Sequence, residues 1–188
     1  MSPCTGLVVR HAQPVDWERV VAAMPDWWGG RDLTHLLPRI FFEHFRTTSW
    51  IAEHEDELVG FLVGFLCPTH VDEAYVHFAG VAPAWRRAGL ARDLYRRFFE
   101  VARADGRAHV HAVTAIVNRD SIAFHRRLGF SLLPGDFEVD GLPAVGDPNV
   151  PEGGVVRFEL RLSETGVVDE SATASRDVDG ARPGRGRR

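Results

Sequence analysis

The stretch from residue 74 to residue 104 joins a strand-like segment to a helix-like one through a short loop with two arginines and a glycine. The strand-like segment is Ala74–Val81 (AYVHFAGV), and the loop that follows reads APAWRRAG. The helix-like segment is Leu90–Ala104, which is expected to bury Leu90, Leu94, Phe98 and Val101. A helix leaves its first backbone N–H groups without intrahelical partners, and its dipole adds positive charge there. The pattern therefore predicts an anion site where this strand turns into this helix.

The residues of the loop suit a phosphate group. Gly89 has no Cβ to block the close approach of a ligand, and Ala91 keeps the next turn small. Arg86 and Arg87 carry fork-shaped donors that match phosphate oxygens. The loop lacks the Gly-Lys-Ser/Thr ending of a P-loop and the G-x-G-x-x-G of a dinucleotide site. The alternative is an ordinary solvated turn in which the glycine merely fits the backbone.

A second polar pattern lies further along the chain, in the segment NRDSIAFHRRLGF that begins at Asn118. Asn118 is a suitable helix N-cap, and at ~100° per residue it shares one helix face with Ser121, Ile122 and His125. Phe124 and Leu128 are expected on another face, toward the core. The segment predicts a helix with a polar stripe, and a plain solvent-facing amphipathic helix is the alternative.

Strand-like and helix-like patterns alternate over most of the remaining chain up to residue 162. Runs of β-branched and aromatic residues predict strands at Gly6–Arg10, Ser49–Glu53, Leu58–Phe65, His109–Val113 and Val155–Leu162. Apolar residues at helical spacing predict helices at Pro14–Met24, Asp32–Phe45 and Ser121–Leu128. The segment PDWWGG is expected to be a turn, and Pro38 is expected to start or kink a helix. Strands that alternate with helices favour an α/β domain.

Composition narrows the functional classes. The chain has 188 residues and a formal net charge of −4, which argues against a general nucleic-acid binder. Its two cysteines, Cys4 and Cys67, have no metal or redox spacing, so no metal is expected. There is neither an apolar run long enough for a membrane span nor the pattern of a signal peptide. We therefore expect a cytoplasmic protein with no nucleic-acid or membrane partner.

The C-terminal segment differs from the rest of the chain. Residues 163–188 are poor in large apolar side chains and rich in glycine, serine, aspartate and arginine. Such a segment cannot bury enough apolar surface to offset the entropy of ordering it. We expect one folded domain over residues 1–162 and a disordered tail over residues 163–188.

The loop at residues 86–91 and the segment at residues 118–130 together resemble the GNAT superfamily of acetyl-CoA-dependent N-acetyltransferases. The loop is similar to the R/Q-x-x-G-x-G/A acetyl-CoA loop of that family, and the second segment is similar to its N-x-x-[small]-…-L-G-F helix. The order and the spacing of the two motifs match as well. The resemblance implies an α/β (α+β) fold: a single domain with a mixed, mostly antiparallel central sheet, a splayed strand pair, and flanking helices.

The resemblance also implies where acetyl-CoA binds. Backbone N–H groups of the loop would hold the pyrophosphate, and the end of the central strand would pair with the pantetheine arm. The N–H of Val81 would face the thioester oxygen and stabilise the oxyanion. Asn118 would bond the pantetheine or a bridging water. The residues expected at acetyl-CoA are Val81, Ala82, Pro83, Arg86, Arg87, Ala88, Gly89, Leu90, Ala91, Arg92, Asn118 and Ser121.

The chain departs from the family pattern at one helix position. That position is often tyrosine, the proton donor to the departing thiolate, and it is His125 here. An imidazole can do this work, because the reference pKa values are ~6.5 for histidine and ~8.5 for a thiol. The alternatives for His125 are a hydrogen bond to the cofactor and simple packing.

The resemblance places the general base on the central strand or in the loop before it. Glu73 and His77 are the candidates. On a regular strand Tyr75, His77 and Ala79 would share one face with Val81, and a bulge would change that. The alternatives are a solvated carboxylate for Glu73 and a satisfied core histidine for His77.

The segment after the first strand is expected to cover the acceptor pocket, as is common in the family. Trp27, Trp28, Arg31 and Tyr75 are the candidate substrate contacts, unless both tryptophans belong to the core. Arg31 would clamp a carboxylate, which favours a small amine bearing an acid group, or a peptide N-terminus, over a polycation. We expect a small-molecule amine as acceptor and a monomer or a homodimer. The alternatives are a peptide or protein N-acetyltransferase and a catalytically weak acyl-CoA-binding module.

Overall fold

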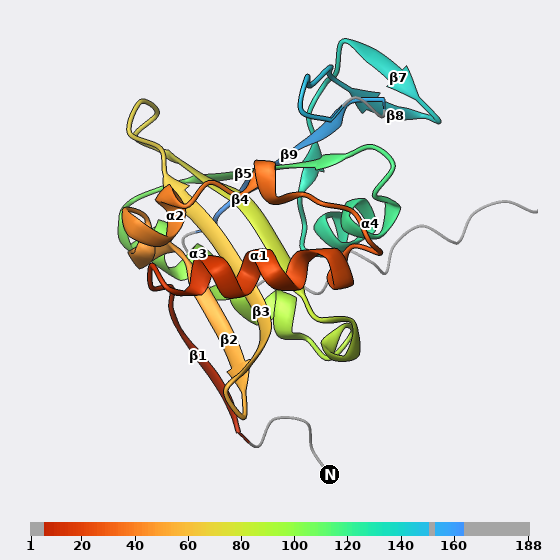
Figure 1. The fold of residues 1–188 in the computed structure, drawn as a ribbon. Coiled ribbons are helices and arrows are strands. Elements are labelled where there is room, and N and C mark those ends of the chain that lie inside the picture. The colour runs from red at the N-terminus through yellow and green to blue at the C-terminus, as the bar shows by residue number, and fades with distance from the viewer. Residues whose placement is uncertain (1–5, 151–152, 164–188) are drawn as a thin grey trace, which may run out of the picture.

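The computed structural model describes residues 6–150 and 153–163, and its main feature is a seven-stranded sheet (Figure 1). The strands are β1 (Leu7–His11), β2 (Trp50–His54), β3 (Glu57–Leu66), β4 (Glu73–Val81), β5 (His109–Ala115), β6 (Ser131–Leu132) and β9 (Val155–Arg161). Their order across the sheet is β1-β2-β3-β4-β5-β9-β6. Neighbouring strands are antiparallel except β4 and β5, which are parallel. The predicted mixed, mostly antiparallel sheet is confirmed.

Helices cover both faces of this sheet. They are α1 (Asp16–Trp27), α2 (Ile40–Glu43), α3 (Leu90–Ala104) and α4 (Arg119–Arg127). On one face α1 and α2 pack over β2, β3 and β4, in a core that includes Met24 and Phe42. On the other face α3 and α4 pack in a second core, which includes Phe98 and Phe158. The amphipathic patterns of the helices explain this layering, because each helix turns its apolar side to the sheet.

A two-stranded hairpin, β7 (Phe137–Val139) and β8 (Leu142–Ala144), projects from one corner of the molecule (Figure 1). The sequence patterns predict neither this hairpin nor β6. Strands of two or three residues are too short to show an alternation of apolar and polar side chains.

Two predicted helices differ from the observed ones. The helix α1 runs through Pro25 and ends at Trp27, so PDW is helical and not part of a turn. The predicted helix over Asp32–Phe45 is wrong, because the segment forms only the 3-10 helix Thr34–Leu36 and the single turn α2. Pro38 has no N–H to donate, and it lies between the two, where the helical hydrogen bonding is interrupted.

The other predicted elements lie within two residues of the observed ones, and α3 matches at both ends. Among the residues described, no helix is long and apolar enough to cross a bilayer. The predicted tail lies outside the described residues, apart from Ser163.

Candidate functional site

The strands β4 and β5 separate and leave a fork between them. Their parallel pairing runs from Glu73 and His109 to Val76 and Ala112 and then stops, although β4 continues to Val81. Strand β3 stays paired with β4 to its end, so it is β5 that diverges. The predicted splayed strand pair is present, and the fork opens toward the carboxyl ends of both strands.

A backbone donor of β4 points into the fork. Ala82 donates its N–H to the Val59 carbonyl at 2.9 Å, and the preceding Val81 lies opposite Gly60 of β3. Successive N–H groups of a strand point to opposite edges, so the N–H of Val81 points away from β3. That side is the fork, where β5 is no longer paired with β4. The N–H of Val81 therefore has the direction required to meet a ligand between the strands.

The loop before α3 is open and offers unpaired donors. The backbone N–H groups of residues 87–92 donate to no other group of the described chain, and the first bond of the helix runs from Asp93 N to Gly89 O at 3.0 Å. Gly89 is the N-cap, with a φ of 88°, and Arg87 has a φ of 65°. These left-handed residues turn the chain sharply from the end of β4 into α3. The result is an accessible helix N-terminus directly after the fork-lining strand, which is a favourable place for an anion.

Arg86 ties the end of β4 to α1. Its Nε donates to the Val81 carbonyl at 3.2 Å, and its guanidinium also donates to the Trp27 carbonyl. In this conformation its donors are directed at backbone carbonyls. Arg87 and Arg92 are exposed and form no ion pair with any described residue, so they are the arginines free to meet a phosphate.

Asn118 lies on the other side of the fork, between β5 and α4. Its Oδ1 accepts the N–H of Ser121 at 3.1 Å, so the predicted N-cap is present. Within the described residues its side-chain amide group donates to nothing. Asn118 thus fixes the start of α4 and keeps one donor free near the fork.

His125 lies in the core and not on a polar stripe. It is 4% exposed, and its ring stacks on Phe158 with the centroids 4.7 Å apart. Its Nδ1 lies 2.8 Å from the Ser121 carbonyl, and its Nε2 lies 2.9 Å from the Tyr95 hydroxyl. A carbonyl only accepts, so Nδ1 carries the proton and Tyr95 donates to Nε2. Burial lowers the pKa of His125, although the bond to Ser121 opposes this, and the ring is neutral.

Ile122 and His125 share a face of α4 as predicted, but the polar stripe expected on that face is wrong, because both residues are buried. The helix turns Ile122 and His125 into the core, while Ser121 is half-buried. Both ring nitrogens of His125 have partners within the protein, which fits the packing alternative. Tyr95 of α3 is the partner of Nε2, and burial raises the pKa of its hydroxyl.

A β-bulge lies at His77 in the middle of β4. Val63 of β3 pairs with Phe78, whereas the next residue of β3, Gly64, pairs with Val76. His77 is therefore an extra residue between two paired positions. The bulge coincides with the point where β5 leaves β4, so it shifts the side chains at the base of the fork.

The bulge divides the β4 side chains that a regular strand would place on one face. Tyr75 stacks on Phe65 with the centroids 5.4 Å apart, on the side of α1 and α2. His77 lies on this side too, whereas Ala79 and Val81 pack against the core beneath α3. The face predicted for a regular strand is thus broken, in the way expected of a bulge.

His77 is held by its neighbours. Its Nε2 donates to the Leu36 carbonyl at 2.7 Å, and its ring stacks on Phe41 with the centroids 4.4 Å apart. Burial lowers the pKa of His77, so the ring is neutral. Burial and the charge of Asp147 raise the pKa of the neighbouring Tyr75 to about 12, so its hydroxyl is protonated.

Glu73 begins β4, at the closed end of the paired segment. Its Oε2 lies 3.7 Å from Nε2 of His111 on β5. A second imidazole–carboxylate pair lies beside it, with His109 Nδ1 2.6 Å from Glu159 Oε1, although the two are not aligned as a hydrogen bond. Sequence reasoning missed both histidines of β5. The signal was present in HVH, because alternate residues of a strand share a face.

The two tryptophans have different positions. Trp27 is 7% exposed and stacks on Phe61, so it belongs to the core. Trp28 is half-buried and covers Gly80 of β4, where a Cβ would lie 2.4 Å from the indole. Trp28 is thus a wall beside the fork, and Arg31 is exposed beyond the end of α1.

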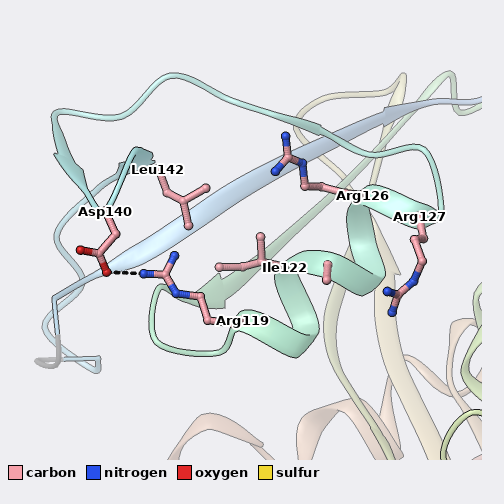
Figure 2. A pocket seen from close by; sticks show the side chains of 7 residues that line it. Arg119, Ile122, Arg126, Arg127, Asp140 and Leu142 are labelled. Atoms are coloured by element: carbon pink, nitrogen blue, oxygen red, sulfur yellow. Dashed lines mark hydrogen bonds and ion pairs between the residues drawn. The ribbon is translucent and has the colours of Figure 1, made fainter. Parts of the chain in front are cut away.

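A hollow of about 450 Å³ lies away from the fork, between α4 and the β7–β8 hairpin (Figure 2). Arg119 of α4 forms an ion pair with Asp140 of the hairpin turn at this hollow. None of its lining residues comes from β4 or β5. In the described part of the chain, no group of three or more His, Cys, Asp or Glu side chains is placed to hold a metal ion.

Sequence comparisons identify relatives of this chain. The model of the Acetyltransferase (GNAT) family matches residues 17–130. The L-2,4-diaminobutyric acid acetyltransferase of Shouchella clausii (strain KSM-K16) is 33% identical over 89 residues, which are 47% of this chain and 50% of that protein. The enzyme of the same name from Marinococcus halophilus is 31% identical over 86 residues, which are 46% of this chain and 50% of that protein. The chain thus matches about half the length of these relatives.

Solved structures share the fold. Ard1 from Thermoplasma volcanium superposes with a TM-score of 0.64 at 18% identity, over 85% of this chain and 99% of that chain. The diaminobutyrate acetyltransferase EctA from Paenibacillus lautus, in complex with L-2,4-diaminobutyric acid and coenzyme A, superposes with a TM-score of 0.60 at 20% identity, over 82% of this chain and 94% of that chain. The family match spans the fork, the anion loop and α4 together, and the chain therefore belongs to the GNAT family of acetyltransferases.

Proposed function

We propose that the protein is an N-acetyltransferase that transfers the acetyl group of acetyl-CoA directly to a primary amine of a small molecule. The observation that carries the proposal is the fork between β4 and β5, which continues into the open N-terminus of α3. A long, anionic thioester needs such a combination: a groove for its arm and unpaired donors for its phosphates. Family membership and the diaminobutyrate acetyltransferase relatives support the proposal.

The residues around the fork would hold acetyl-CoA in a defined order. The pyrophosphate would accept from the backbone N–H groups of residues 87–92, with the exposed Arg87 and Arg92 adding positive charge. The pantetheine arm would run along the open edge of β4 at Val81–Pro83. Asn118 would donate its free amide to the same arm from the other side.

The protein would contribute to the reaction mainly through position and a backbone donor. Holding the amine against the thioester carbonyl turns an encounter in solution into a local reaction. The N–H of Val81 would stabilise the oxyanion that forms when the amine attacks. Such a donor changes the rate by ~10²–10³ in other acyl-transfer enzymes.

The acceptor would lie on the α1 side of β4 and β5, against Trp28 and Tyr75. The carboxylate of Glu159 is half-exposed on β9, and Arg31 is exposed in the segment that follows α1. A small amine with a second ammonium group and a carboxylate fits these charges. L-2,4-diaminobutyric acid has that chemistry, and it is the compound named for the relatives.

An acceptor screen tests the proposal. The purified protein is given acetyl-CoA with L-2,4-diaminobutyrate, other diamines, monoamines and short peptides, and the free thiol of CoA is measured. We expect thiol release with one or more small amines and none with peptides. Release with peptides alone would make the protein a peptide N-acetyltransferase. Tight acetyl-CoA binding without thiol release in any mixture would leave only the acyl-CoA-binding module.

A further inference from the structure

One face of β5 and β9 is left uncovered by the helices. The core under α1 and α2 contains side chains from β2, β3 and β4 and, among the described residues, none from β5 or β9. The register of the sheet places four residues in a row across this face, one on each of β3, β4, β5 and β9. They are Phe65, Tyr75, His111 and Glu159. The neighbouring row, from Leu66 to Leu160, turns to the opposite core.

His111 lies in this row next to the base of the fork. It pairs with Tyr75, one position before the last pair of β4 and β5. Its side chain is 20% exposed, so a small molecule can reach it without unfolding the site. Glu73 is two residues further from the fork on β4, about 7 Å along the strand, and it reaches the fork only through His111.

The Glu73 carboxylate lies near one nitrogen of the His111 ring, beyond hydrogen-bond distance but close enough to favour one tautomer. Nε2 lies 3.7 Å from the Glu73 carboxylate, and no other group of the described chain forms a hydrogen bond with the ring. A carboxylate that faces Nε2 favours the tautomer with its proton on that nitrogen. The lone pair is then on Nδ1, which is free to accept a proton.

His77, the other histidine at the base of the fork, is less suited to receive a proton. Its Nε2–H is already bonded to the Leu36 carbonyl, and Phe41 covers one side of the ring. No carboxylate faces it in the described structure, and burial lowers its pKa. An imidazolium at that position would be buried without a counter-charge, whereas the carboxylate of Glu73 lies beside the ring of His111.

We infer that His111, oriented by Glu73, is the general base that takes a proton from the acceptor amine. This role rests on the proposed N-acetyltransferase function and names a residue for it. The ionisable groups that face His111 are Glu73 and Tyr75 on β4, His109 on its own strand and Glu159 on β9, with Asp147 beyond Tyr75.

The proton balance of the reaction is complete with one base. The acceptor binds as an ammonium ion and gives one proton to Nδ1 of His111, directly or through a single water. The lone pair left on nitrogen forms the bond to the thioester carbon, and the carbon–sulfur bond breaks with its electron pair going to sulfur. A second proton leaves the nitrogen and ends on that sulfur as the thiol. His111 then releases its proton to solvent.

The pH dependence of catalysis tests this role. General-base catalysis contributes ~10²–10⁴ to a rate, so His111→Gln should lower kcat/KM for L-2,4-diaminobutyrate about 100-fold at pH 7. The deficit should shrink as pH rises toward 10, because the free amine is then present in solution and needs no base. The KM for acetyl-CoA should stay within about twofold. Glu73→Gln should lower kcat/KM less than His111→Gln does, since it acts through the ring.

His109→Gln is the matched control. His109 shares the face, the strand and a carboxylate partner with His111, but it lies two residues further from the fork. The kcat/KM of the His109→Gln variant should stay within about threefold of the wild-type value at every pH. The inference is overturned if kcat/KM of His111→Gln falls by the same factor at every pH, or falls no more than that of the control. It is also overturned if only His77→Gln shows a loss of kcat/KM that disappears at high pH.

A measurement on the wild-type protein does not depend on activity. Nitrogen-15 NMR of the histidine rings distinguishes the two neutral tautomers. We expect His111 with its proton on Nε2, and a shift of its resonances in Glu73→Gln. A proton on Nδ1 would overturn the inference. A wild type that acetylates no amine would overturn the proposed function as well, whereas an active wild type with an unaffected His111→Gln variant overturns only the role of His111.

Discussion

Charge and shape can be tested separately at Gly89. The residue has a φ of 88°, and a Cβ built on it meets no atom within 4 Å, so a substitution costs only the backbone strain of about 1 kcal/mol. Gly89→Glu places a carboxylate at the open N-terminus of α3. Because like charges in contact cost several kcal/mol, we expect acetyl-CoA affinity to fall more than ~100-fold. Gly89→Gln has the same shape and strain without the charge, so its loss should be much smaller.

Calorimetric titration of both Gly89 variants with acetyl-CoA measures this difference. The gap between the two variants should narrow at high salt, because exposed charges are screened. Equal affinities for the glutamate and glutamine variants would contradict an anion site at the loop.

The buried pair of Tyr95 and His125 makes a prediction about stability. Tyr95→Phe keeps the aromatic packing and removes the donor to Nε2, which then has no partner in a site that is 4% exposed. An unsatisfied buried acceptor lowers the free energy of unfolding by about 1–3 kcal/mol. Urea unfolding of the variant should show this loss while kcat stays within about twofold. A variant with wild-type stability and a reduced kcat would instead support a catalytic His125.

For single residues, the sequence predicts the features that depend on local backbone chemistry. The glycine at the start of α3 and the Asn118 cap are such features, and both are present. The direction of His125 depends on how a short helix packs, since a nine-residue helix has polar and apolar residues on more than one face. The bulge at His77 depends on the register that β3 imposes on β4, which no local pattern encodes.

Four charged side chains join the elements β1, α1 and β2. Asp16 is 1% exposed and bonds Arg10 at 2.7 Å, and Glu53 bonds the same guanidinium at 2.8 Å. Arg19 contacts both carboxylates. Burial alone would raise the pKa of Asp16, but hydrogen bonds from Arg10 and from the Gln13 N–H lower it on balance. The Arg10 hydrogen bond also lowers the pKa of Glu53.

Asp16→Asn should loosen the junction of these three elements. It leaves two arginines facing a site with one carboxylate. Removing one partner of a fully buried ion pair costs about 3 kcal/mol, and the loss here should be smaller because both guanidinium groups are about a third exposed. Glu18→Gln is the matched control on the same helix, because Glu18 is 76% exposed and its ion pair is worth little. Thermal unfolding of both variants measures the difference. An Asp16→Asn protein as stable as the control would contradict a structural role for the cluster.

Elements with long periodic patterns are predictable from the sequence, and short or interrupted ones are not. The helix α3 shows an apolar stripe over fifteen residues and is predicted at both ends. The segment around Pro38 has apolar residues at helical spacing too, but it forms only two short helical turns, one on each side of this proline. The hairpin β7–β8 is held by pairing between three-residue strands, which leaves no period to detect.

The extent of the folded domain can be tested by truncation. Leu162 is buried and donates its N–H to the Ala108 carbonyl at 2.8 Å, so the folded domain extends at least to this residue. We predict that a chain ending at Ser163 has a Tm within about 2 °C of the full chain and an unchanged affinity for acetyl-CoA. A chain ending at Phe158 is the control, since it removes part of β9 and should lose far more. A loss of several degrees in the first variant would show that residues 164–188 stabilise the domain.

Two buried histidines should make the stability of the whole molecule depend on pH. Burial lowers the pKa of His77 and of His125 in the folded state, while an unfolded chain has the ordinary value of ~6.5. Below that pH the unfolded state takes up protons that the folded state does not, so protons favour unfolding. The free energy of unfolding should therefore reach its full value above pH ~7 and should decrease as the pH falls below ~6.5. Protonation of Asp16 and Glu53 should lower the free energy of unfolding further only below pH ~4, because the pKa values of both carboxylates are lowered in the folded state.

Urea unfolding at a series of pH values between 8 and 5 measures this dependence, and single variants assign it. His77→Gln and His125→Gln each remove one buried imidazole, so each should be less stable at pH 8 yet lose less of its remaining stability on acidification than the wild type. The other histidines stay in both variants, so the difference in slope belongs to the replaced ring alone. If the free energy of unfolding depends on pH in both variants as it does in the wild type, burial keeps neither imidazole neutral. His77 and His125 would then both become candidates for proton transfer again.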